Sequence, residues 1–191
     1  MLTVKPITNS IKNDREVLQN ISNLYSSAFP RQEQAPLALL INQTKKDTVK
    51  FFAFYDGDVF VGLTYTISFK DMTYLWYLAI QSDLRSKGYG SQIMRYLHEL
   101  YPNNRIILNL DVQDETAIDS EIRKKRKEFY IKNGYSSTGY LCTFHGNKLD
   151  VMAINGNVTF DEFSSIFKNY FGPIIYFFEK PKILHNEKNG G

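Results

Sequence analysis

The chain has 191 residues, of which 43% are hydrophobic, 15% aromatic and 23% charged. This length favours one domain, and the apolar and aromatic content excludes an intrinsically disordered chain. A formal net charge of +3 is too small to indicate nucleic-acid binding by itself. The single cysteine, Cys142, excludes an internal disulfide and fits a reducing cytosol. No stretch has the length of a signal peptide or membrane helix, so the sequence predicts a cytoplasmic protein without membrane contact.

The first half of the chain mixes helical and strand patterns. Hydrophobic side chains at helical spacing indicate helices, and alternating or β-branched runs indicate strands. An Asp-Gly turn between two β-rich runs is a strong hairpin signal. The predicted elements are a strand at 2–7, a helix from Asn13 or Asp14 to Phe29, a short helix at 36–42, a hairpin around Asp56-Gly57-Asp58 and a strand at 72–80.

The second half begins with a glycine-containing loop that leads into a helix. Asn133-Gly134 is a helix stop, and Thr159 with Glu162 forms a capping-box pattern. The predicted elements are a helix with Ile93, Met94, Leu97 and Leu100 on one face, a strand at 105–112, a helix at about 119–132, a hairpin of 135–144 and 149–154 across His145-Gly146-Asn147, a helix from Thr159 with Phe160, Phe163, Ile166, Phe167 and Tyr170 inward, and a strand at 174–178.

This order of elements predicts one α+β domain built on a mixed, mostly antiparallel sheet flanked by helices. We expect the domain to cover residues 1–155. Residues 156–184 would form a helical extension packed on it, which could shape a pocket, cover the sheet edge or form a homodimer surface. Residues 185–191 are predicted to be a disordered tail.

The most informative segment runs from the strand at 72–80 into the following helix. Gly88 and Gly90 permit close backbone approach by another molecule, and the N–H groups of residues 86–91 lie at the positive end of a helix dipole. Arg85 and Lys87 add positive charge. The pattern favours a pyrophosphate site, although a simple turn between strand and helix gives the same signal. The segment matches neither a Walker loop nor a dinucleotide fingerprint.

Two motifs carry a family resemblance. RSKGYG, with Arg85, Gly88 and Gly90, follows the apolar triplet Leu78-Ala79-Ile80 and resembles motif A of the GNAT superfamily of N-acetyltransferases. FYIKNGY, with Tyr130, Gly134 and Tyr135, is similar to a second family motif, Y-x-x-x-G-[FY]. The order of elements over about residues 1–155 agrees with the family as well.

The resemblance implies transfer of an acetyl group from acetyl-CoA to an amine, by direct attack in a ternary complex. It implies a splayed central strand pair that admits the thioester, and Tyr130 as the general acid. Pantetheine would pair with the preceding strand end, and the loop amides would bind pyrophosphate. The residues that the resemblance assigns to acetyl-CoA are Leu78, Ala79, Ile80, Arg85, Ser86, Lys87, Gly88, Tyr89, Gly90 and Ser91.

One segment departs from the family pattern. The usual Asn-x-x-Ala before the tyrosine is replaced by Arg123-Lys-Lys-Arg126, within the basic run RKKRK at residues 123–127. This run is most simply interpreted as a solvated helix face. Binding of the CoA 3′-phosphate or of nucleic acid are alternatives, but the run lacks the interleaved aromatics of a nucleic-acid platform.

The acceptor amine must lose a proton, so a base or a water relay is needed. Asp111, at the end of the strand at 105–112, is the favoured base, although capping of the next loop is an equal alternative. The loop with Arg31, Gln32 and Glu33 often borders the acceptor pocket in the family. Trp76 and Tyr77, expected on opposite faces of their strand, provide one further candidate for that pocket.

The remaining chemistry-bearing residues give weaker signals. The three histidines are far apart and lack metal-ligand spacing, so no metal is predicted. Cys142 is expected in the core, and a Cys142–His145 nucleophile pair is a minor alternative. The overall prediction is an N-acetyltransferase that uses acetyl-CoA and a primary amine. The alternatives are transfer of another acyl group, a CoA-binding regulatory module without catalysis, and a nucleic-acid binder.

Overall fold

A computed structural model of the chain describes residues 2–144 and 146–184 and divides into two compact units. The first unit comprises the residues up to 68 together with 75–102, and the second comprises 69–74 and the residues from 103 onward. The predicted boundary at residue 155 stays a prediction. The predicted tail at 185–191 and His145 lie outside the described residues. In the described part, no helix is long and apolar enough to cross a membrane.

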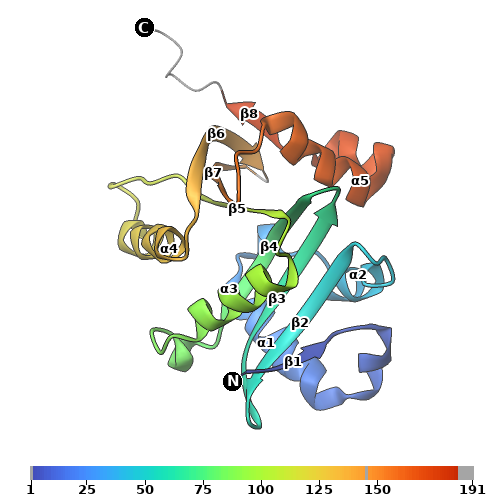
Figure 1. Ribbon diagram of the computed structural model, residues 1–191. Coiled ribbons are helices and arrows are strands. Elements are labelled where there is room, and N and C mark those ends of the chain that lie inside the picture. The colour runs from blue at the N-terminus through green and yellow to red at the C-terminus, as the bar shows by residue number, and fades with distance from the viewer. Residues whose placement is uncertain (1, 145, 185–191) are drawn as a thin grey trace, which may run out of the picture. The chain divides into compact units, whose positions relative to one another are not determined.

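Eight strands form a mixed sheet in the order β1-β2-β3-β4-β5-β7-β6-β8 (Figure 1). Strands β4 and β5 pair in parallel, from Met72 with Arg105 to Tyr74 with Ile107. The pairs β1–β2, β2–β3, β5–β7, β6–β7 and β6–β8 are antiparallel. The α+β class with a mixed, mostly antiparallel sheet and flanking helices is thereby confirmed.

The first unit confirms the predicted elements closely. Asp14 caps α1 by accepting a hydrogen bond from the Val17 N–H at 3.2 Å, and the two-residue turn between Asp56 and Val59 closes the β2–β3 hairpin. The elements are β1 (Thr3–Pro6), α1 (Arg15–Ala28), α2 (Leu37–Gln43), β2 (Val49–Asp56), β3 (Val59–Phe69), β4 (Met72–Ile80) and α3 (Tyr89–Leu100).

The helix α3 is amphipathic, as the sequence predicts, with one exception. Ile93, Met94 and Leu97 are fully buried, but Leu100 is 39% exposed. The helix ends at Leu100, so its last residue has no further turn to hold it against the unit.

The second unit contains the remaining strands and two helices: β5 (Arg105–Asp111), α4 (Ser120–Lys132), β6 (Ser136–Phe144), β7 (Asn147–Ile154), α5 (Phe160–Glu179) and β8 (Lys182–Leu184). The capping box of Thr159 and Glu162 is present at the start of α5. Phe163 and Phe167 of α5 pack on Tyr74, with ring centroids 5.5 and 5.1 Å away, and Phe160 is only half-buried.

The predicted strand at 174–178 is wrong, because these residues belong to α5. The helix kinks at Gly172, whose φ is 74° and ψ 169°, and resumes after Pro173. Proline fits the first position of a helix, since no intrahelical acceptor awaits its missing N–H. A short apolar run of β-branched and aromatic residues cannot be assigned to helix or strand by periodicity alone. The last strand, β8, lies further along at Lys182–Leu184.

Candidate active site

The predicted pyrophosphate loop lies at the start of α3 in the first unit. Ser86 and Gly88 both adopt left-handed backbone conformations, with φ of 61° and 85°. Gln92 is the first residue of α3 to donate its N–H into the helix, to the Gly88 carbonyl at 3.1 Å. The N–H groups of the preceding turn therefore have no helical acceptor, which makes the helix start an anion-binding position. A Cβ at Gly88 would meet no atom within 4 Å, so the loop leaves open space there.

Two side chains fasten this loop to neighbouring elements of the same unit. The Arg85 Nε donates to the Ile80 carbonyl at 3.2 Å, and the Tyr89 hydroxyl donates to Asp56 at 2.7 Å. The hydrogen bond to the Asp56 carboxylate raises the pKa of Tyr89. Residues 85–88 are exposed. An exposed, tethered loop with free backbone donors and two cations, Arg85 and Lys87, fits a phosphate ligand such as the CoA pyrophosphate.

The end of β4 leads into this loop. Leu78 and Ile80 are half-buried, whereas Ala79 between them is buried. Gly62 of β3 lies so close that a Cβ there would meet the Ala79 carbonyl oxygen at 2.3 Å. Gly62 therefore permits a close backbone approach between the two strands.

Trp76 and Tyr77 do not face opposite sides of β4, and that prediction is wrong. Their rings stack, with centroids 5.2 Å apart and an angle of 11° between the planes. Successive side chains of a regular strand point to opposite faces, so β4 departs from regular alternation at this point. Both rings also contact Tyr65 of β3, at 6.1 and 6.2 Å.

Tyr77 of this aromatic pair packs against the end of α1, next to the turn between α1 and α2. Three residues predicted to border the pocket for the acceptor amine lie in that turn. Arg31, Gln32 and Glu33 form a 3-10 turn, with the first two exposed and Glu33 half-buried. The Tyr77 ring packs on Tyr25 and Phe29, at 5.1 and 4.8 Å. In the first unit Tyr77 lies against this turn and Trp76 stacks on Tyr77, while their role in acceptor binding stays a prediction.

Tyr130, the predicted general acid, lies in the last turns of α4 in the second unit. It is 8% exposed, and its ring packs on Phe129 and Tyr135 with centroids 5.0 and 5.8 Å away. Burial raises the pKa of Tyr130 to about 12, and the positive charge of Arg126 acts in the opposite direction. The phenol is therefore protonated at neutral pH, the form that a proton donor requires.

Asp111, the predicted base, ends β5 and faces an arginine of α4. Its Oδ2 lies 3.6 Å from the Arg126 Nη1. Arg123 donates to the Val112 carbonyl at 3.2 Å and pairs with Asp119 at 2.8 Å. Arg126 thus contacts the end of β5 through Asp111, and Arg123 contacts the loop after β5 through Val112.

The prediction that the basic run at 123–127 is a solvated face is wrong for Arg123 and Lys127, whose side chains are half-buried, whereas Arg126 is exposed. Besides Arg123 and Arg126, Lys127 forms an ion pair, with its Nζ 3.0 Å from Asp150 of β7. Asp150 is buried and also accepts a hydrogen bond from Ser137 at 2.6 Å. Lys124 and Lys125 are exposed and match the prediction. Sequence spacing could have shown the pair of Arg123 with Asp119, four residues apart, but not the pairs of Arg126 and Lys127, whose partners come from other elements.

Cys142 is fully buried in β6, and burial raises the pKa of its thiol to about 12. A thiol in this environment is a poor nucleophile, which argues against a catalytic role. The proposed partner His145 lies outside the described residues. Among residues 2–144 and 146–184, no group of three or more His, Cys, Asp or Glu is arranged to hold a metal ion.

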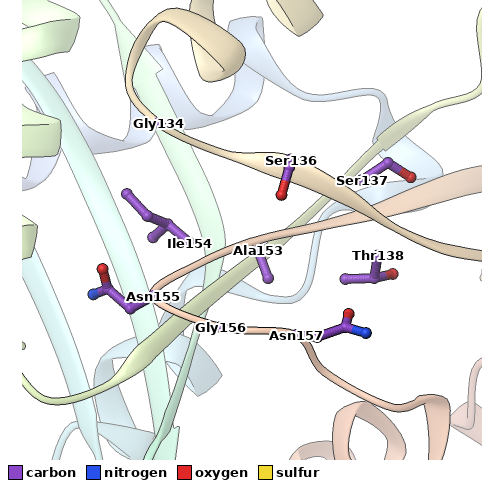
Figure 2. A pocket seen from close by; sticks show the side chains of 9 residues that line it. All are labelled: Gly134, Ser136, Ser137, Thr138, Ala153, Ile154, Asn155, Gly156 and Asn157. Carbon is purple, nitrogen blue, oxygen red and sulfur yellow. The ribbon is translucent and has the colours of Figure 1, made fainter.

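One hollow of about 300 Å³ lies in the second unit (Figure 2). Ser136, Ser137 and Thr138 of β6 line it on one side. The turn after β7 lines the other side with Asn155, Gly156 and Asn157. None of the residues predicted for catalysis, acetyl-CoA or acceptor binding lines this hollow, so it is separate from the candidate chemistry.

The class of the protein follows from the fold together with the family comparison: an α+β domain in which an exposed glycine loop leads from a central strand into a helix. The family model of the GNAT acetyltransferases matches residues 18–120, more than half of the chain. The chain therefore belongs to the GNAT acetyltransferase family, whose members use acyl-CoA.

Solved structures share the fold at low sequence identity. A chain assigned to the GNAT acetyltransferase family from Bacteroides thetaiotaomicron is 21% identical, with a TM-score of 0.69 over 91% of this chain and 98% of that one. An aminoglycoside 6′-N-acetyltransferase complexed with coenzyme A is 20% identical, with a TM-score of 0.63 over 79% and 95%. A chimera of a spermidine N-acetyltransferase from Vibrio cholerae is 16% identical, with a TM-score of 0.60 over 90% and 99%.

Proposed function

We propose that the chain transfers an acetyl group from acetyl-CoA to the primary amine of a small molecule or peptide, by direct attack in a ternary complex. The single observation that carries this proposal is the loop before α3. It combines left-handed Ser86 and Gly88, a helix start with unpaired N–H groups, and the exposed cations Arg85 and Lys87.

The residues proposed to hold acetyl-CoA belong to the first unit. Residues 85–91 would bind the pyrophosphate through backbone N–H groups, and the backbone of Leu78, Ala79 and Ile80 would pair with pantetheine as an added strand does. Bound acetyl-CoA supplies a thioester carbon that a neutral amine can attack. Arg85 already contacts the Ile80 carbonyl, which links the two parts of this site.

Two residues of the second unit are proposed for the proton transfers. Asp111 would accept, directly or through water, the proton that the amine must lose before attack. Tyr130 would donate its phenolic proton to the departing sulfur. The support for Tyr130 is its match to the family motif and its burial, which keeps the phenol protonated.

The proposed acceptor site comprises Arg31, Glu33, Trp76 and Tyr77. Its support is the hydrogen bond from Tyr77 to the turn between α1 and α2, together with the stacking of Trp76 on Tyr77. The similar structures include enzymes named for aminoglycosides and for spermidine, both of which are amines. An amine with several polar or charged groups is therefore the first class to test.

The deciding experiment is a screen of the purified chain with acetyl-CoA against a panel of amines, read by mass spectrometry. A product heavier than one amine by an acetyl group would support the proposal. Binding of acetyl-CoA without turnover of any amine would indicate instead a regulatory module. Parallel reactions with propionyl-CoA and succinyl-CoA would separate acetyl transfer from transfer of another acyl group.

A further inference from the structure

One arginine of α4 stands where the family motif has an alanine. Arg126 lies four residues before Tyr130, and residues four apart are neighbours on one helix face. Its guanidinium is exposed and forms an ion pair with Asp111, with 3.6 Å between Nη1 and the carboxylate. One turn earlier, Arg123 donates to the Val112 carbonyl and fixes the same helix face to the end of β5.

We propose that Arg126 is a positioning residue for Tyr130, and that its charge stabilises the phenolate formed when Tyr130 gives its proton to the departing sulfur. The inference rests on the proposed function, since it assumes that Tyr130 is the general acid. Asp111 then has a second role, because its carboxylate holds the guanidinium in place.

The need for such a charge follows from the acidities involved. Burial raises the pKa of Tyr130 to about 12. An ordinary thiol has a pKa of about 8.5, so the proton transfer from phenol to thiolate is unfavourable by roughly 10³-fold. A nearby positive charge reduces this penalty because it favours the phenolate.

Among the groups around Tyr130, Arg126 is the one that can stabilise the phenolate. From its own helix the Phe129 ring packs on Tyr130 and Arg126 lies one turn earlier, and the ring of Tyr135, just before β6, packs on it as well. The positive charge of Arg126 lowers the pKa of Tyr130. Burial raises the pKa of Tyr135 far above neutrality, so that phenol is uncharged. Within the described residues, Arg126 is thus the cation that acts on Tyr130.

As the carbon–sulfur bond breaks, its electron pair stays on sulfur and accepts the Tyr130 proton, which leaves a phenolate. The acceptor nitrogen loses one proton on forming the amide. That proton returns through water to the phenolate, and the proton that Asp111 took from the amine before attack passes to solvent, so the enzyme ends the cycle unchanged.

The test titrates residue 130 directly, without acetyl-CoA. Incorporation of 3,5-difluorotyrosine at position 130 moves the phenol titration to a pH at which the protein stays folded, and fluorine NMR follows it. Arg126→Gln should lower the phenolate-to-phenol ratio at fixed pH by about two- to tenfold, as expected for loss of one nearby partly screened charge. Arg126→Lys should restore most of the ratio. Lys124→Gln is the matched control, because it removes an exposed charge from the same helix, and it should change the ratio less than about 1.5-fold.

Kinetics with unmodified Tyr130 give the second reading. Arg126→Gln should lower kcat by about three- to tenfold and leave KM for acetyl-CoA unchanged, whereas Lys124→Gln should leave both unchanged. An unaltered titration in Arg126→Gln would overturn the inference, even in a fully active enzyme. A wild-type chain that acetylates no amine would instead refute the proposed function, so the two failures are distinguishable.

Discussion

Tyr77 donates a hydrogen bond from its phenol to the carbonyl oxygen of Glu33, with 2.7 Å between the two oxygens. The same phenol oxygen accepts a hydrogen bond from the Ala35 N–H at 3.3 Å. One side chain of β4 thereby fixes the turn between α1 and α2. Because Tyr77 is 2% exposed and its hydroxyl is already used, Tyr77 would contribute to the proposed acceptor site by shaping this turn. The half-buried Trp76 is the member of the stacked pair that remains available to a ligand.

Gly88→Glu should abolish the rise in Tm that acetyl-CoA produces in the wild-type chain. A ligand that binds only the folded state raises Tm by mass action. The glutamate would place bulk and negative charge at the start of α3, where the pyrophosphate is proposed to bind. The measurement is thermal unfolding with and without acetyl-CoA.

Gly57→Glu is the matched control for this experiment. Gly57 also has a positive φ, of 57°, and also faces open space, but it lies in the β2–β3 turn. This variant should have a lower Tm, yet keep the full response to acetyl-CoA. An undiminished response in Gly88→Glu would exclude the loop as the acetyl-CoA site.

Tyr130→Phe should lower kcat by about 10²-fold, the low end for general acid catalysis. The ring contacts with Phe129 and Tyr135 remain, so folding and acetyl-CoA binding should be normal. Since the pKa of Tyr130 is about 12, its phenol stays protonated throughout the neutral range. The loss should therefore be uniform from pH 6 to pH 9, and a kcat profile over that range tests this. A kcat near that of wild type, with chemistry rate-limiting, would leave Tyr130 as a core residue only.

Lys127→Met should lower the free energy of unfolding by about 1–3 kcal/mol, because it leaves the buried Asp150 carboxylate without its cation. The value is below that for a fully buried pair because Lys127 is partly exposed. Lys124→Met, on the exposed side of the same helix, should change it by less than about 0.5 kcal/mol. Urea denaturation measures both variants. Equal stabilities would mean that the Lys127–Asp150 pair contributes nothing.

Glu162 should contribute to stability in a pH-dependent manner. Arg105 donates to Glu162 at 2.9 Å and to Asp71 at 2.9 and 3.1 Å, and the hydrogen bond from Arg105 is the main cause that lowers the pKa of Glu162 to about 2. A carboxyl with a lowered pKa stabilises the fold above its unfolded pKa of 4.5, and this contribution is lost as pH falls toward 2.

Glu162→Gln should therefore lower Tm by about 1–4 °C at pH 7, a range reduced by solvent screening of this partly exposed pair. The difference from wild type should shrink progressively between pH 4.5 and pH 2. Asp161→Asn, which removes the neighbouring exposed carboxylate, is the control. A difference that stays constant down to pH 2 would contradict the assignment to Glu162 ionisation.

Local sequence patterns predict most of the fold because each depends on neighbours a few residues apart. The cap at Asp14, the hairpin at Gly57 and the strand Met72–Ile80 are of this kind. The helical run after Pro173 was not predictable, since its apolar residues fit a strand equally well and only the kink at Gly172 separates the two halves of α5.

The candidate site was predictable where a motif fixes it and not where distant residues meet. The glycine loop and Tyr130 follow from sequence motifs. The stacking of Trp76 on Tyr77 requires an irregular strand, which strict alternation cannot show. The pairing of Lys127 with Asp150 joins residues 23 positions apart, and no local pattern encodes it.

The division of the chain into two units has a consequence for synthesis on the ribosome. Met72–Tyr74 pair with Arg105–Ile107, and β5 in turn pairs with β7, which ends at Ile154. The start of β4 is thus made roughly 2–7 s before its partner β5 at ordinary translation rates. We expect the first unit to fold on the nascent chain while Met72–Tyr74 are still without their partner strand β5. Translational-arrest force measurements at increasing chain lengths should accordingly detect two folding events, the first after residue 102 has left the ribosome and the second only after residue 154 has done so.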